Sequence, residues 1–291
     1  MSHKKKKGSI KTLDIDKMLN LISSKSKKVR KKIKAVKVKK SKIKKLNKPS
    51  KQPEKKGVRE KISSGIPNFD KLIEGGFGKN SANVIVGGSG SGKTIFAAQF
   101  LVDGMKKGEK CLYVTFEEKK EQFYKNMLEF GWDFEEYERK KLFTFLEYSP
   151  VKVKTMLEEG GGAIETTILR QEVTRIVIDS ITSFALLFEK ELEKREAALM
   201  LFNMIAGWNC TSLLTLEEDP LSSKEMTSKT IEFESDSIIL IYYLQQKGER
   251  KRYLEILKMR GVKHSNKIYE FEIGSRGINV SSKRLNKLEQ S

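Results

Sequence analysis

One octapeptide, Gly-Gly-Ser-Gly-Ser-Gly-Lys-Thr at residues 87–94, constrains the fold of this chain more than any other feature. It fits the pattern G-x-x-x-x-G-K-[ST], with the apolar residues Val84–Val86 before it and Ile95–Ala98 after it, as a strand–loop–helix unit requires. Glycines let the backbone wrap around a polyanion, and the loop N–H groups and helix N-terminus offer partial positive charge. The pattern therefore predicts a phosphate-binding loop for a nucleoside triphosphate.

The residues of this loop have separate expected roles. The backbone that is expected to surround the phosphates comes from Gly87, Gly88, Ser89, Gly90, Ser91 and Gly92. Lys93 adds a full positive charge at the β and γ oxygens, and Thr94 places a hydroxyl where Mg²⁺ would bridge those oxygens. A glycine-rich turn that matched by chance would not combine this lysine, this threonine and these apolar flanks.

Positive charge is concentrated at the amino-terminal end of the chain. Residues 1–60 hold 24 Lys and Arg against 4 Asp and Glu, whereas residues 61–291 hold 34 of each, so the net charge of +20 lies in the first fifth. A segment so poor in bulky apolar side chains cannot offset the entropy cost of ordering. We expect residues 1–57 to form a largely disordered basic tail, with a short helix near residues 12–22, and residues 58–291 to form one globular domain.

Composition also indicates the cellular compartment. Cys111 and Cys210 both lie in apolar stretches, where a cysteine is usually a small buried hydrophobe. The sequence has no disulfide framework, no zinc-ligand spacing, no apolar run of about 18 residues, and no apolar signal segment within residues 1–20. These features predict an intracellular protein of the reducing cytoplasm.

Short apolar runs alternate with helical patterns through the expected globular domain. Strands are expected at 82–87, 111–116, 142–146, 175–179, 211–216, 236–244, 253–259 and 267–273, and helices at 94–105, 119–130, 163–172 and 189–208. The middle runs are continuously apolar, which is typical of strands that helices cover on both faces. The pattern predicts an α/β domain with a mainly parallel central sheet that finishes in antiparallel strands, although periodicity does not give the strand order.

Acidic residues follow two of the expected buried strands. Asp179 ends the run RIVID, so its carboxylate is expected at the carboxyl edge of the sheet, where it would hold Mg²⁺ through water. The alternative role for Asp179 is to cap the next helix. Glu117 and Glu118 follow the run CLYVTF, where a carboxylate could polarise a water in line with the γ-phosphate. Spacing alone does not separate this role from a charged start of the next helix.

The order of six segments resembles that of the KaiC-like branch of RecA-type ATPases. The segments are SGIPNFDKLIEGGF (64–77), GGSGSGKT (87–94), YVTFEE (113–118), FGW (130–132), VIDS (177–180) and LKMRGVKH (257–264), and the resemblance covers about residues 62–280. It implies a RecA-like P-loop NTPase core that binds ATP and Mg²⁺ and hydrolyses ATP. It also implies that Glu117 and Glu118 serve the attacking water and that Asp179 serves the metal.

The same resemblance implies an active site shared between subunits. In the family, the K-x-R-G-x-x-H element reaches into the ATP site of the next subunit of a ring. Lys258 and Arg260 would then meet the γ-phosphate in trans, and His264 would lie near the nucleotide. The implied assembly is a homo-oligomer, expected to be a hexamer. Without the resemblance, Lys258 and Arg260 would be ordinary surface cations on one face of a strand.

One departure from the family bears on self-phosphorylation. The clock protein that names the family has two such domains, and its second domain phosphorylates a Ser–Thr pair, which aligns here with Glu232 and Phe233. Clock-type autokinase activity is therefore not expected of this chain. Thr227, Ser228 and Thr230 lie nearby and leave self-modification at other positions open.

The leading hypothesis is a single-domain KaiC-like ATPase ring that regulates an unknown protein partner. The first alternative is a RecA/RadA-type recombination ATPase on DNA, but residues 217–236 hold more acidic than basic residues and suit a phosphate backbone poorly. The second is a non-hydrolysing ATP sensor, against which the retained glutamates and cations argue. For the tail, DNA or RNA is the first expected partner, through counterion release, with an anionic membrane surface, an acidic protein or a solubilising role without a partner as alternatives.

Overall fold

The computed structural model describes residues 60–149, 162–185, 187–188, 190–221, 229–246 and 248–285. The predicted basic tail over residues 1–57 and the predicted domain start at residue 58 lie outside these ranges. Thr227 and Ser228 lie outside them as well, so self-modification there stays an open question. No helix in the described part of the chain has the length and hydropathy needed to cross a membrane.

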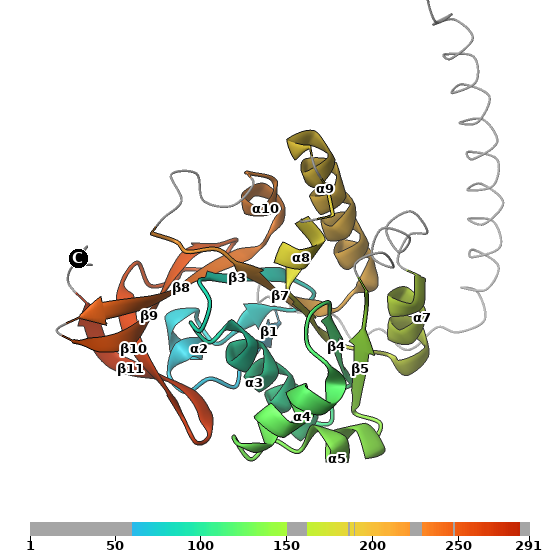
Figure 1. The fold of residues 1–291 in the computed structure, drawn as a ribbon, viewed down its shortest axis with the longest axis horizontal. Helices are drawn as coiled ribbons and strands as arrows, with labels where there is room; N and C mark the ends of the chain where they lie inside the picture. The colour runs from blue at the N-terminus through green and yellow to red at the C-terminus, as the bar shows by residue number, and fades with distance from the viewer. Residues whose placement is uncertain are drawn as a thin grey trace, which may run out of the picture. The chain divides into compact units, whose positions relative to one another are not determined.

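Within the described residues, nine strands form one sheet in the order β11-β10-β9-β8-β3-β7-β6-β4-β5 (Figure 1). These strands are β3 (Ala82–Gly87), β4 (Cys111–Thr115), β5 (Phe143–Glu147), β6 (Arg175–Asp179), β7 (Thr211–Glu217), β8 (Ser237–Gln246), β9 (Glu249–Met259), β10 (Ile268–Gly274) and β11 (Gly277–Leu285). Pairing is parallel from β8 to β5 and antiparallel from β8 to β11. The predicted α/β class, with a mainly parallel sheet and antiparallel C-terminal strands, is confirmed.

Helices cover both faces of the sheet (Figure 1). The longer ones are α3 (Lys93–Lys106), α4 (Lys120–Leu128), α7 (Gly162–Gln171) and α9 (Glu191–Trp208), and the short ones are α2 (Phe69–Leu72), α5 (Phe134–Arg139), α8 (Ile181–Ala185) and α10 (Lys229–Glu234). One hydrophobic cluster joins the sheet to α3, α4 and α5, and a second joins it to α7 and α9. Burial on both faces explains the continuous apolar runs of the central strands.

The parallel register brings the ends of four strands to one edge of the sheet. Gly87 of β3 pairs with Glu217 of β7, and Thr115 of β4 pairs with Asp179 of β6. Parallel strands of an open α/β sheet bind ligands beyond their carboxyl ends. The phosphate loop therefore begins at the edge where these acidic residues also end their strands.

Several elements were not predicted from the sequence. Strand β11 is largely polar, and only Ile278 and Val280 of its apolar residues are buried among those that the structure describes. Two apolar residues do not predict a strand, and β11 is recognised only by its pairing with β10. The short helices α2, α5, α8 and α10 have too few turns to show a periodic pattern, as do the two-residue strands β1 (Lys61–Ile62) and β2 (Phe77–Gly78). These two strands pair with each other in a separate antiparallel sheet.

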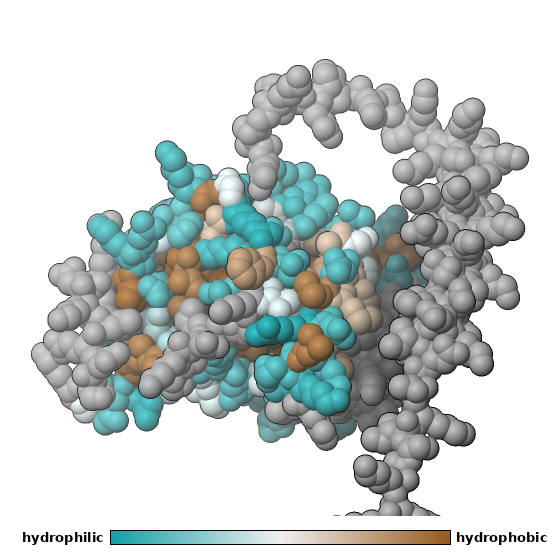
Figure 2. Space-filling model, turned by 90° about the horizontal axis from the view of Figure 1, so that it is seen from above, coloured by the Kyte–Doolittle hydropathy of each residue, from teal (hydrophilic) through white to brown (hydrophobic). Residues whose placement is uncertain are grey.

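The surface on the side of α9 and α10 is mixed in character. Figure 2 shows this side from above, with separate hydrophobic patches among hydrophilic residues. The large apolar side chains exposed on these two helices are Leu192, Leu199, Met200 and Phe233, and that of Phe233 is 67% exposed. The Phe233 carbonyl accepts a hydrogen bond from Arg260, a predicted catalytic residue.

A buried ion-pair cluster fastens α3 to the start of β6. Arg175 is 1% exposed and forms ion pairs with Asp103 at 3.1 Å and Glu109 at 2.6 Å. It also donates a hydrogen bond to the carbonyl of Phe100 at 2.8 Å. Gly104 makes room for the guanidinium, since a Cβ there would lie 2.6 Å from Arg175 Nε. The cluster satisfies charges that would otherwise be buried at high cost.

We expect Arg175→Ala to lower the free energy of unfolding by about 3 kcal/mol or more, because it leaves two partly buried carboxylates without their partner. Urea unfolding without nucleotide would measure the change. As a control, Lys190→Ala removes an exposed ion pair with Glu193 and should cost less than about 1 kcal/mol. Equal losses for the two variants would show that the cluster contributes no more than a surface pair.

Candidate nucleotide site

The loop between β3 and α3 has the backbone that a phosphate cradle needs. Gly90 and Gly92 have φ values of 70° and 107°, in the left-handed region that favours glycine. A Cβ at Gly87 would lie 2.7 Å from Ser91 Oγ and 2.8 Å from the Ile241 carbonyl oxygen, so this position also needs a glycine. Because α3 begins at Lys93, its unpaired N-terminal N–H groups lie at this loop.

Lys93 is buried in the phosphate loop, where its side chain contacts backbone carbonyls. Its Nζ donates hydrogen bonds to the carbonyls of Gly87 and Gly88, each at 2.9 Å, and the residue is 8% exposed. Burial lowers the pKa of Lys93, while the carboxylates of Glu217 and Asp179 act in the opposite direction. No carboxylate of the described residues lies within 4.0 Å of this ammonium. Its charge is therefore available to a phosphate.

Asp179 accepts hydrogen bonds from three hydroxyl groups. Thr94 Oγ1 lies 2.9 Å and Tyr113 Oη 2.6 Å from Asp179 Oδ2, and Thr215 Oγ1 donates to Oδ1. Burial raises the pKa of the Tyr113 phenol well above its usual value, and the Asp179 charge adds to the effect. The structure thus brings the predicted metal residues Thr94 and Asp179 into direct contact.

These groups fit Mg²⁺ held together with a nucleotide. A Thr94 hydroxyl that donates its proton to Asp179 keeps a lone pair for the cation, and the carboxylate can accept from a metal-bound water. Among the described residues, no group of three or more His, Cys, Asp and Glu side chains could hold a metal ion without further ligands. Phosphate oxygens would have to complete the coordination, as in P-loop enzymes generally.

The two adjacent glutamates have different surroundings. Glu117 Oε1 accepts a hydrogen bond from Ser180 Oγ at 2.8 Å and another from Ser183 Oγ, and Glu117 lines the cavity at the loop. Two hydroxyl donors on one oxygen fix the orientation of this carboxylate. Its position suits a group that orients a water molecule.

Glu118 is held farther back, by helix α4. Asn126 Nδ2 donates to Glu118 Oε1 at 2.9 Å, and Glu118 does not line the cavity. Burial raises the pKa of the Glu118 carboxyl, although the hydrogen bond from Asn126 acts against it. The structure therefore gives different surroundings to two residues that sequence spacing treats alike.

The cavity at the loop has a volume of about 300 Å³. It is lined by Ser89, Gly90, Gly92, Lys93, Thr94, Ile95, Glu117, Asp179, Ser180, Glu217, Arg252 and Ile273. Two charged residues in it, Glu217 and Arg252, were not predicted as site residues. Glu217 ends a buried strand, the same signal that pointed to Asp179. Arg252 lies within antiparallel β9, where nothing in the local sequence marks it.

Arg252 connects β9 to the phosphate loop. Its guanidinium donates two hydrogen bonds to the Gly90 carbonyl, at 3.1 and 3.3 Å, and lies 4.2 Å from the centroid of the Tyr243 ring. Stacking on an aromatic ring suits a guanidinium, which keeps its in-plane donors free. The same chain that forms the loop thus supplies a second cation to the cavity.

Lys258, Arg260 and His264 lie away from the loop of their own chain. Lys258 Nζ donates to the carbonyls of Glu232 and Ser235, the latter at 2.6 Å, and Arg260 donates to the Phe233 carbonyl. His264 Nδ1 lies 3.2 Å from the Ser265 carbonyl oxygen. The structure therefore does not bring these three residues together with Lys93 and Glu117.

The strand register shows how the separation arises. Gly87 pairs with Ile241 of β8, which pairs with Leu254 of antiparallel β9. Lys258 is four residues beyond Leu254 along β9, so it lies roughly 13 Å from Leu254, toward the opposite edge of the sheet. Arg260 is farther still.

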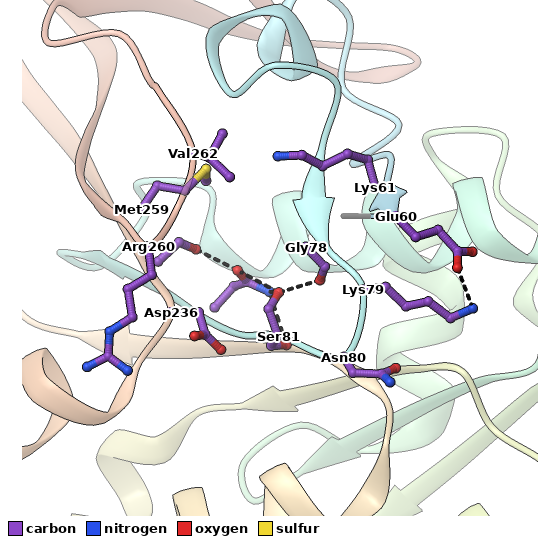
Figure 3. A pocket seen from close by; sticks show the side chains of 12 residues that line it. Glu60, Lys61, Gly78, Lys79, Asn80, Ser81, Asp236, Met259, Arg260 and Val262 are labelled. Carbon is purple, nitrogen blue, oxygen red and sulfur yellow. Dashed lines mark hydrogen bonds and ion pairs between the residues drawn. The ribbon is translucent and has the colours of Figure 1, made fainter. Parts of the chain in front are cut away.

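A second and larger cavity, of about 430 Å³, occupies that opposite edge. Figure 3 shows Met259 and Arg260 on one side of it and Glu60, Lys61 and Lys79 on the other. Glu60 and Lys79 form an ion pair at 2.8 Å. The residues predicted to act on a nucleotide thus lie at two opposite edges of the sheet within one chain.

A phosphate loop at the carboxyl edge of a parallel sheet, with a strand-end aspartate beside it, defines a RecA-like P-loop ATPase fold. The family model described as "ATPase: KaiC" matches residues 62–284, and the chain belongs to this KaiC-like ATPase family.

Similar proteins agree with this assignment. UPF0273 protein MK0039 of Methanopyrus kandleri is 34% identical over 239 residues, which cover 78% of this chain and 94% of that protein. Circadian clock protein KaiC3 of Synechocystis is 32% identical over 81% of this chain, but the match covers 48% of that longer protein. The crystal structure of the KaiC-like protein PH0186 of Pyrococcus horikoshii is similar with a TM-score of 0.69, at 37% identity, over 77% of this chain and 100% of that one.

Proposed function

We propose that this protein binds and hydrolyses ATP with Mg²⁺ as an oligomeric ring in the cytoplasm, and that its nucleotide state regulates a protein partner. The geometry of the phosphate loop carries the proposal. Lys93 is buried without a carboxylate partner among the described residues, where its ammonium donates hydrogen bonds to the neutral carbonyls of Gly87 and Gly88. A phosphate would be a stronger, charge-assisted partner for this group.

The side chains around the loop divide the work of hydrolysis. Bound Mg²⁺ would neutralise charge on the β and γ oxygens. Thr94 presents a hydroxyl to the metal position, and Asp179 orients that hydroxyl. Glu117, held by Ser180 and Ser183, would orient and polarise the attacking water.

Assembly into a ring would complete the site. Lys258 and Arg260 lie too far from the phosphate loop of their own chain to reach a nucleotide bound there. In a ring they could reach a nucleotide bound at the loop of an adjacent subunit. Phe233, whose carbonyl accepts from Arg260, exposes 67% of its surface next to these cations. An exposed aromatic beside a functional cation is typical of a protein interface. We propose a hexamer, with His264 near the nucleotide of the neighbouring subunit.

The test is Mg²⁺-dependent ATP turnover measured together with mass in solution, with and without nucleotide. Turnover by a ring, but not by the monomer, is the expected result. ATP binding without turnover would favour a non-hydrolysing sensor. Extended assemblies that form only on DNA would favour a recombinase.

The basic tail is proposed to bind DNA or RNA. Deletion of residues 1–57 should remove this binding, because residues 61–291 hold equal numbers of acidic and basic residues. ATP turnover and assembly should stay nearly unchanged. If six to ten lysines contact phosphates, the affinity of the full chain should fall by roughly 10³- to 10⁵-fold between about 50 and 200 mM salt. Fluorescence anisotropy with unrelated oligonucleotides would measure both effects.

The control for this deletion is a full-length variant in which glutamine replaces the lysines of residues 1–57, which keeps the length of the tail without its excess of positive charge. Loss of binding in both variants would assign the affinity to charge. Several tails on one ring should also bind more tightly than a single tail, through multivalency. Nucleic-acid binding that survives the deletion would place the site in the folded domain instead.

A further inference from the structure

The side chain of Tyr113 is buried at the metal position and has no role in the function proposed above. It lies in the middle of β4, it is 0% exposed, and its hydroxyl is 2.6 Å from Asp179 Oδ2. This oxygen is the one that also accepts from Thr94 Oγ1 at 2.9 Å. Tyr113 and Thr94 therefore share one acceptor atom.

Aromatic packing holds the Tyr113 ring in place. Its centroid lies 4.3 Å from that of Phe123 on α4 and 5.4 Å from that of Phe145 on β5, where the two rings are stacked at 17°. Contacts with these two neighbouring rings in the core leave the phenol little freedom to move. Its hydroxyl is thus aimed at Asp179 by the core and not by the ligand.

The hydrogen bonds from Tyr113 and Thr215 leave the Asp179 carboxylate a restricted set of orientations. Thr215 Oγ1 donates to Oδ1 while Tyr113 and Thr94 donate to Oδ2, so both oxygens are engaged. A carboxylate free to rotate could turn toward the cation, or it could accept the Thr94 hydrogen bond from a different direction. A fixed one keeps the Thr94 lone pair directed to a single position.

We propose that Tyr113 is a positioning residue for the metal: its hydroxyl orients Asp179, and through Asp179 the Thr94 hydroxyl, toward the Mg²⁺ that accompanies ATP. This inference rests on the proposed ATP-binding function and deepens it. Tyr113 does not line the cavity at the phosphate loop. Its effect is therefore expected in the metal dependence of nucleotide binding and not in nucleotide binding alone.

The test is Tyr113→Phe in the full chain, titrated with a fluorescent ATP analogue in excess Mg²⁺ and in EDTA. The ring and its packing remain, while one hydrogen bond to Asp179 is lost. Affinity in EDTA should match that of the parent, whereas the gain in affinity produced by Mg²⁺ should fall by about 3- to 10-fold. The Mg²⁺ concentration for half-maximal ATP turnover should rise by a similar factor, with a smaller change in kcat at saturating Mg²⁺.

The matched control is Tyr124→Phe, which removes a hydroxyl from the same aromatic cluster. Tyr124 Oη donates to Glu138 Oε2 at 3.0 Å, away from Asp179, so its loss should leave the Mg²⁺ titration unchanged. Equal Mg²⁺ dependence in Tyr113→Phe and the parent would overturn the inference and leave the proposed function standing. So would an equal loss of affinity in EDTA and in Mg²⁺, which would indicate a structural role. A parent chain that binds no nucleotide would overturn both.

Discussion

Lys93→Ala should abolish ATP binding, whereas Glu117→Gln combined with Glu118→Gln should preserve binding and lower kcat by roughly 10²-fold or more. The first variant removes the buried cation at the phosphates, and the second removes only the carboxylates that would act on water. Nucleotide titration and steady-state turnover on the same preparations would separate the two outcomes.

The structure refines this prediction for the single glutamates. Glu117 lines the cavity and accepts from Ser180 and Ser183, while Glu118 is held by Asn126 outside the cavity lining. Glu117→Gln alone should therefore account for most of the lost turnover. If the double variant turns over ATP at the parent rate, the glutamates are only a charged start of α4. If Lys93→Ala binds ATP as the parent does, the loop is not a phosphate site.

Mixing two inactive variants should restore ATP turnover if the active site is shared between subunits. Lys93→Ala lacks the loop cation, and Arg260→Ala lacks the cation at the opposite edge of the sheet. In a mixed ring, some interfaces pair an intact loop with an intact Arg260. At equal amounts and random assembly, about a quarter of the interfaces would be complete, because each requires the right variant on both sides.

The readout is turnover as a function of mixing ratio, in samples shown by mass to contain both variants. Arg252→Ala provides the contrast, because Arg252 contacts Gly90 of its own chain and would have to act on the same side as Lys93. A mixture of Arg252→Ala with Lys93→Ala should therefore show no more turnover at any ratio than the two variants measured separately. Failure of the Arg260 mixture to recover activity despite co-assembly would contradict action in trans.

Much of the fold was evident from local patterns. The loop residues 87–94, the continuous apolar runs and the helices between them predicted a mainly parallel α/β sheet, because burial on both faces leaves a direct record in composition. The polar strand β11 and the helices of six residues or fewer show no such apolar pattern in the sequence. Their structure depends on pairing and packing with distant segments, which local composition does not encode.

The site divides in the same way. The strand-end position of Asp179 and the sequence of the loop predicted a phosphate and metal site, because the carboxyl ends of parallel strands share one edge. The order of strands was decided only in the tertiary structure, since it depends on which strands pair across the sheet. That order places Glu217 and Arg252 in the cavity, aims the core residue Tyr113 at Asp179, and carries Lys258 and Arg260 to the opposite edge. The nucleotide loop and the α/β sheet could be predicted because their signals lie within short stretches of the chain. Which distant side chains meet at the loop, and which lie away from it, could not be predicted, because their distances follow from long-range strand pairing.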